Sequence, residues 1–106
     1  MIVAFSISPS VADEDGSVSA GVAEAVRVVR ASGLPCETNA MFTNIEGEWD
    51  EVMAVVKDAV DAVARTCDRV SLVLKADIRP GHTGQLSAKV ERLEQRLTER
   101  GTDPLG

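Results

Sequence analysis

Two extended segments in the middle of the chain follow one another with only a turn between them, and this restricts the fold more than any other feature. Residues 36–40 read CETNA, and residues 42–47 read FTNIEG, directly before a helical pattern that begins near Trp49. Strands so close in sequence pair as an antiparallel hairpin, because a parallel pair needs a crossover of roughly a dozen or more residues. We therefore expect a hairpin that turns around Ala40 and Met41, although no Asn-Gly type of turn marks it.

Strand and helix patterns alternate on both sides of this hairpin. Ser17 has the character of a helix N-cap, and Gly33 stands where that helix would end. We expect the elements, in chain order, at residues 2–8 (strand), 17–32 (helix), 36–40 (strand), 42–47 (strand), 49–66 (helix), 69–78 (strand) and 84–100 (helix). The order βαββαβ with an additional C-terminal helix predicts an α+β, ferredoxin-like fold with an antiparallel sheet, as a single domain over residues 1–106. In that fold the helices cover one face of the sheet.

Successive side chains of a strand point to opposite faces of its sheet, and this divides the strand residues into two sets. The apolar set should meet the helices: Val3, Phe5, Ile7, Cys36, Thr38, Ala40, Ile45, Val70, Leu72, Leu74, Ala76 and Ile78. The other set mixes hydroxyls, amides, acids, a lysine and a few apolar groups: Ala4, Ser6, Ser8, Glu37, Asn39, Met41, Phe42, Asn44, Glu46, Ser71, Val73, Lys75 and Asp77. A face of this mixed kind is a usual place for self-association or for a small ligand, and a solvated surface is the ordinary alternative.

The last helix carries a narrow apolar seam of Leu86, Val90, Leu93 and Leu97, at spacings of four, three and four. Such a seam is more often part of the core, and a subunit interface is the second reading.

The overall composition argues against several classes of partner. The net charge is −6, and no basic patch rises above this background, so we expect no nucleic-acid or anionic-membrane partner. The two cysteines, Cys36 and Cys67, and the single histidine lack the spacing of a zinc site. No apolar run reaches membrane length and the N-terminus shows no signal-peptide pattern, so we expect a cytoplasmic protein without a bound metal or cofactor.

Three groups of residues are candidates for chemistry. Glu46 and Glu48 would point the same way on a continuing strand, either as an acid and a base or as a charged edge that prevents further strand pairing. The segment RPGHTG, residues 79–84, would hold an anion at a helix start or form a flexible loop, and it lacks the P-loop pattern. Lys75 and Asp77 would pair with each other or with acids across the sheet, or Asp77 would receive a ligand's amino group. Because no nucleophile with a neighbouring base is visible, we expect no catalytic residues.

Three segments, VAFSISP, MFTNIEGEWDEV and RVSLVLKADIRPG, resemble the family of small thiamine-binding proteins over nearly the whole chain. The most specific parts are the Met-x-Thr-x-Ile-Glu-Gly run from Met41 to Gly47 and the Lys-x-Asp-x-Arg run from Lys75 to Arg79. The resemblance implies a ferredoxin-like fold that assembles, sheet face to sheet face, into dimers and commonly tetramers. It also implies binding of thiamine or of its hydroxymethylpyrimidine part, without catalysis. Phe42 stands where a glycine would be more typical, which would make the pocket tighter or change its shape.

The open face and the resemblance together nominate nine ligand-binding residues: Ser6, Ser8, Asn39, Met41, Phe42, Thr43, Glu46, Lys75 and Asp77. The acids would bind the amino group of the pyrimidine or balance the thiazolium charge, and Ser6, Asn39 and Thr43 would complete the hydrogen bonds. Met41 or Phe42 would pack on the rings. Strict alternation turns Thr43 inward, and we include it because the end of a hairpin can break the pattern.

Two other functions stay open from the sequence. The domain would act as a regulatory or scaffold module on a partner enzyme, or as a small hydrolase that uses Glu46 and Glu48.

Overall fold

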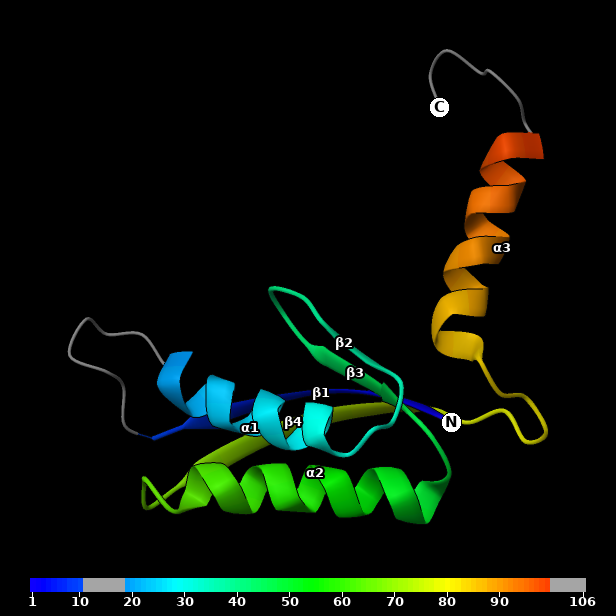
Figure 1. Cartoon of the computed structure of the whole chain (residues 1–106). Helices are drawn as coiled ribbons and strands as arrows, with labels where there is room; N and C mark the ends of the chain where they lie inside the picture. The colour runs from blue at the N-terminus through cyan, green and yellow to red at the C-terminus, as the bar shows by residue number, and fades with distance from the viewer. Residues whose placement is uncertain (11–18, 100–106) are drawn as a thin grey trace.

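The computed structural model describes residues 1–10 and 19–99. Its elements are β1 (Ile2–Pro9), α1 (Ser19–Ala31), β2 (Cys36–Thr38), β3 (Thr43–Glu46), α2 (Trp49–Ala64), β4 (Val70–Asp77) and α3 (Gln85–Glu99). The strands form one sheet in the order β2-β3-β1-β4, and every neighbouring pair is antiparallel. The ferredoxin-like α+β prediction is therefore confirmed (Figure 1). The expected N-cap, Ser17, lies outside the described residues.

The predicted hairpin joins β2 and β3, and its turn is built by one side chain. The Asn39 N–H donates to the Phe42 carbonyl at 2.9 Å, and the Asn39 side-chain oxygen accepts from the N–H groups of Met41 and Phe42, each also at 2.9 Å. Asn commonly forms such turns because its short side chain imitates a backbone carbonyl. Both strands are shorter than predicted, since these hydrogen bonds belong to the turn and end the ladder at Thr38 and Thr43.

The core lies between the sheet and the two helices α1 and α2 (Figure 1). Val3, Phe5, Ile7 and Ile45 are buried from the sheet side, as the alternation predicted. They meet Ala25 and Val29 of α1 and Val52, Val56, Ala59 and Val63 of α2. The prediction was too generous for the last strand, where Leu72 is 41% exposed and Ile78, beyond the end of β4, is 58% exposed. Both positions lie at the edge of the sheet, where the helices do not cover them.

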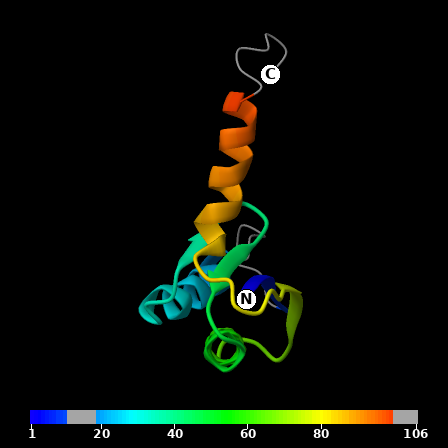
Figure 2. The same ribbon diagram turned by 90° about the vertical axis from the view of Figure 1, so that its right-hand side faces the viewer.

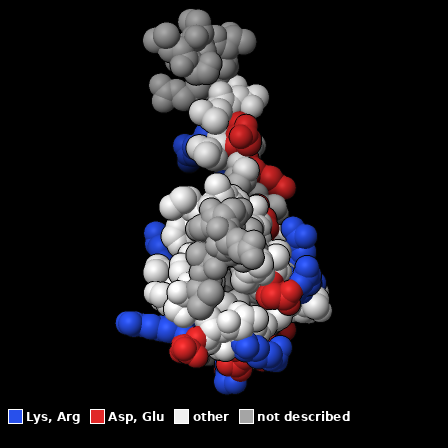
Figure 3. All heavy atoms as spheres, turned by 90° about the vertical axis from the view of Figure 1, so that its left-hand side faces the viewer, with Lys and Arg blue, Asp and Glu red and all other residues white. Residues whose placement is uncertain are grey.

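Helix α3 stands on the other side of the sheet from α2 and rises away from the body (Figures 1 and 2). None of its residues is buried, and its seam residues Val90, Leu93 and Leu97 are 53%, 58% and 52% exposed. The reading of this seam as core is therefore wrong for the single chain. On the face shown in Figure 3, basic and acidic side chains are intermixed rather than gathered by sign.

Candidate functional site

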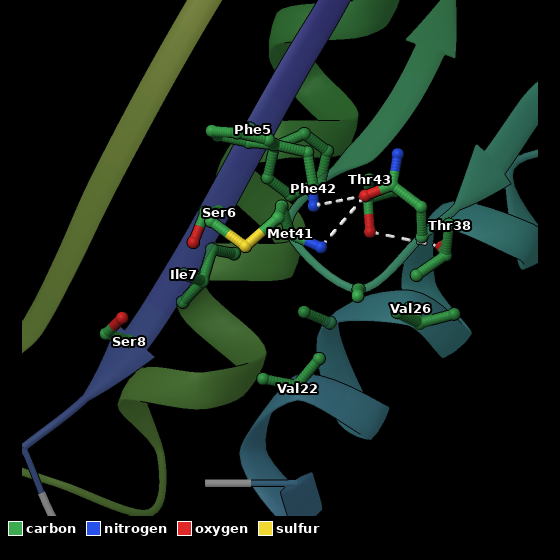
Figure 4. A pocket seen from close by; sticks show the side chains of 13 residues that line it. Phe5, Ser6, Ile7, Ser8, Val22, Val26, Thr38, Met41, Phe42 and Thr43 are labelled. Atoms are coloured by element: carbon green, nitrogen blue, oxygen red, sulfur yellow. Dashed lines mark hydrogen bonds between the residues drawn. The ribbon is translucent and has the colours of Figure 1, made fainter.

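A cavity of about 200 Å³ opens between β1, the β2–β3 hairpin and the first half of α1 (Figure 4). Six of the nine nominated residues line it: Ser6, Ser8, Asn39, Met41, Phe42 and Thr43. Phe5, Ile7, Val22, Ala25, Val26, Thr38 and Ala40 complete the wall. The arrangement puts hydroxyl groups beside two phenylalanines and a methionine, which suits a small planar molecule with a few hydrogen-bonding groups. We call this cavity the hairpin pocket.

The hairpin pocket exists because β1 is longer than the strand beside it. β1 pairs with β4 over its whole length, from Ile2–Asp77 to Pro9–Val70, but it pairs with β3 only as far as Phe5–Thr43. Beyond that point the chain of β3 has turned away into the hairpin. Ser6, Ile7 and Ser8 therefore line an opening where a longer β3 would have lain.

The hairpin side of the pocket is held together by its own hydrogen bonds. The Asn39 side-chain oxygen is used by the turn, and the hydroxyls of Thr38 and Thr43 lie 3.1 Å apart. Thr43 pairs with Phe5 and is buried on the helix-covered side, so strict alternation holds and the expected break at the hairpin end was wrong. Met41 is 72% exposed and extends from the hairpin toward β1 (Figure 4).

Glu46 lies outside the hairpin pocket, at the start of α3. It lies on the open face, as predicted, but it is only 5% exposed. Its carboxylate accepts hydrogen bonds from the backbone N–H groups of Gln85 at 2.8 Å and Leu86 at 3.2 Å. A negative charge here satisfies the unpaired donors of the helix N-terminus and interacts favourably with its dipole. Of the two readings of the RPGHTG segment, the anion site at the helix start is present, and the anion is a carboxylate of the same chain.

Asp77 and Lys75 line a second, wider groove of about 550 Å³ between the open face and α3. Asp77 forms an ion pair with Lys89 of α3, rather than with Lys75. The hydrogen bond and charge of Lys89 hold the pKa of the Asp77 carboxyl below its usual value of 3.8. Ile2, Ala4, Leu86 and Val90 give this groove an apolar part. The nine nominated residues therefore divide between two places, and the acids are on the α3 side.

Glu46 and Glu48 do not form a pair. The strand ends at Glu46, and Glu48 occupies the N-cap position of α2, where its N–H donates to the Glu51 carboxylate at 3.0 Å. Each acid thus serves the start of a different helix. This removes the geometric basis for the hydrolase alternative.

Sequence reasoning missed the wall that α1 contributes, namely Val22, Ala25 and Val26. Ala25 also belongs to the core, and Val22 and Val26 are partly buried. This wall depends on how α1 packs beside the unequal lengths of β1 and β3, which no local sequence pattern indicates. Within residues 1–10 and 19–99, no cluster of three or more potential metal ligands occurs, and no helix there is long and apolar enough to span a membrane.

Comparison with known proteins agrees with this fold and names a family. A UPF0045 protein of Mycobacterium bovis is 53% identical over 99 residues, which cover 92% of this chain and 94% of the relative. The crystal structure of a hypothetical protein from Methanocaldococcus jannaschii superposes with a TM-score of 0.78 at 33% identity, covering 88% of this chain and 94% of the other. A Thermotoga maritima protein that has been proposed to act in thiamine biosynthesis or salvage superposes with a TM-score of 0.71 at 26% identity, over 86% of this chain and 97% of that one. The family model described as "Thiamine-binding protein" matches residues 3–94, and the chain belongs to this family.

Proposed function

We propose that the protein is a non-catalytic, oligomeric binding protein of the cytoplasm for thiamine or a related hydroxymethylpyrimidine, and that the pyrimidine occupies the hairpin pocket. The observation that carries the proposal is the convergence of six nominated residues on one cavity in a member of a thiamine-binding family. The cavity, at about 200 Å³, is smaller than the roughly 300–1,000 Å³ of pockets for drug-sized ligands. A single substituted pyrimidine suits it better than both rings of thiamine.

The nominated residues divide between the hairpin pocket and the α3 side, and this also favours the pyrimidine ring as the occupant of the pocket. Among the residues that the structure describes, none that lines the pocket is acidic, and Glu46 and Asp77 are engaged with α3. A cationic thiazolium would gain little electrostatic stabilisation there, whereas the neutral pyrimidine ring can pack against Phe5, Phe42 and Met41. The thiazolium part of thiamine would then lie toward solvent at the pocket mouth.

The oligomeric part of the proposal rests on the exposed surfaces around α3. Val90, Leu93 and Leu97 present an unpartnered apolar stripe, and Val73 on the open face is 59% exposed. Burial of such surfaces contributes roughly 25 cal/mol per Å². A second copy that packed its own α3 and open face against this chain would cover both the α3 stripe and Val73. The alternative, a module that docks this same stripe on a partner enzyme, predicts a monomer when the protein is pure.

Isothermal titration calorimetry with hydroxymethylpyrimidine and with thiamine tests the ligand. Ser6→Val removes a hydroxyl from the pocket, and we expect affinity to fall about tenfold, the equivalent of one lost hydrogen bond. Ser71→Val is the matched control, because Ser71 faces the same side of the sheet opposite Ser8 and does not line the pocket. No heat and no thermal shift with either compound at millimolar concentration would refute the proposal.

A further inference from the structure

One edge of β1 carries backbone groups that face the hairpin pocket. In an antiparallel pair, the residues that exchange hydrogen bonds alternate along the strand, so odd and even residues of a central strand serve opposite neighbours. The Gly47 N–H donates to the Met1 carbonyl at 3.1 Å, which assigns the odd residues of β1 to β3. The Ser10 N–H donates to the Arg69 carbonyl at 2.8 Å, which assigns the even residues to β4.

Ile7 is the residue of this odd series that lies beyond the end of β3. Val3 and Phe5 are opposite Ile45 and Thr43, but the pairing with β3 stops there. The N–H and C=O of Ile7 therefore point to the side on which the hairpin pocket lies, and Ile7 lines that pocket. Among the residues that the structure describes, no backbone partner replaces the missing strand residue.

The described residues of the hairpin do not supply that partner. The N–H groups of Met41 and Phe42 both donate to the Asn39 side chain, and the Phe42 carbonyl accepts from the Asn39 N–H. The register of β1 and β3, if continued, would place Met41 opposite Ile7, and the Met41 N–H is thus already occupied. Partly buried backbone donors and acceptors are rarely left without a partner, so the Ile7 groups call for a ligand or water.

We propose that Ile7 recognises the aminopyrimidine edge of the ligand by these two backbone groups. Its N–H donates to a ring nitrogen, and its C=O accepts from the exocyclic amino group next to that nitrogen. The ligand thereby takes the place of the strand residue that would otherwise pair with Ile7, as peptides do when they add to a sheet edge. This inference rests on the proposed function and specifies which end of the ligand enters and what selects it.

A backbone N–H and C=O are held in fixed positions by the strand, whereas a side chain can change its rotamer. The Ile7 side chain is buried in the core at 6% exposure, so the donor–acceptor pair is fixed by the fold itself. A heterocycle with an amino group beside a ring nitrogen matches this pair. The analogue in which hydrogen replaces the amino group leaves the Ile7 carbonyl unpaired, and we expect it to bind roughly tenfold more weakly or worse.

Two-dimensional ¹H–¹⁵N NMR of the labelled protein, titrated with hydroxymethylpyrimidine, tests the inference directly. We expect the Ile7 amide proton to shift downfield and to exchange more slowly with solvent on binding. The amides of Val3 and Phe5 are matched controls, because they point to the same edge but already pair with β3. These two should change little.

The outcomes separate the two proposals. If calorimetry shows binding but the Ile7 amide is unchanged, or if the analogue without the amino group binds equally well, the backbone recognition is refuted and the binding function stands. If neither thiamine nor the pyrimidine produces heat or any amide shift, both proposals fail together.

Discussion

Phe42 contributes an aromatic ring to the wall of the hairpin pocket. It lies half-buried in the pocket wall, at the position where the resemblance led us to expect a glycine. Its ring occupies space that a glycine would leave to the ligand, and it offers an aromatic surface in return. A pocket narrowed in this way should favour one ring over two.

Replacement of Phe42 by Gly should therefore change selectivity more than it changes the fold. We expect the preference for hydroxymethylpyrimidine over thiamine to fall about tenfold or more, because a hydrophobic pocket discriminates size by roughly 1–3 kcal/mol. Calorimetric affinities for both ligands measure the ratio. Ala40→Gly is the control for added flexibility in the same turn, because it removes only a methyl group, and an equal change of the ratio in both variants would contradict the assignment to Phe42.

Single residues also show how far sequence reasoning reaches. Alternation correctly placed Val3, Phe5 and Ile45 in the core and Glu46 on the open face, because side-chain direction in a strand is a local property. The partner of Glu46 lies 39 residues away in the chain, at the start of α3. No local sequence pattern indicates such a contact. Glu46 was therefore nominated as a ligand-binding residue, whereas in the structure its carboxylate binds the N-terminal N–H groups of α3.

At the scale of elements, α3 is held to the sheet mainly by polar contacts at its beginning. Glu46 accepts two of its N-terminal N–H groups, and Lys89 pairs with Asp77. The order of strands and helices was predictable from the sequence, but the direction of α3 was not, because a seam with four–three spacing fits core and interface equally well. The hairpin pocket could not be predicted from the sequence either, because it forms where β3 ends opposite Phe5 while β1 continues.

Glu46→Ala should loosen α3 without unfolding the rest. The change leaves two backbone donors without their carboxylate, and loss of an N-terminal cap typically costs about 0.5–2 kcal/mol. Amide hydrogen exchange should accelerate in the first turns of α3 and stay constant in α2. Glu37→Ala is the control, since Glu37 also lies in the sheet but its carboxylate accepts a hydrogen bond from the Asn44 side chain, at 3.4 Å, and not from the start of α3. Equal exchange in α3 for both variants would contradict the role of Glu46.

The ion pair between Asp77 and Lys89 predicts an acid-sensitive attachment of α3. Because the pKa of Asp77 is lowered in the folded protein, its contribution to stability is present above the usual value of 3.8 and is lost as pH falls through the lowered pKa. Exchange of the α3 amides should therefore rise below about pH 4 relative to those of α2. In Asp77→Asn this part of the pH dependence should be absent, and its persistence would assign the effect to another carboxyl group.

For the whole molecule, the decisive question is what covers the α3 stripe. The single chain measures 51 × 35 × 20 Å, and the long dimension reflects the helix that projects from the body (Figures 1 and 2). Because the valine and leucine side chains of α3 remain about half exposed, their packing within the single chain stabilises this helix little. Its helicity is better explained if tertiary or quaternary packing supports it, because isolated helices of this length are marginal.

Leu93→Asp places a charge in the middle of the stripe and should convert the proposed oligomer to a monomer. A charge buried without a partner in a subunit interface costs several kcal/mol, enough to shift a moderate association beyond the concentrations used for measurement. Native mass spectrometry and light scattering give the mass. Gln95→Asp is the matched control, because it adds the same charge on the opposite side of α3 and should leave the assembly intact. A wild-type protein that is monomeric at high micromolar concentration would contradict self-association, and recovery of one stoichiometric enzyme bound through Leu93 would instead support the regulatory alternative.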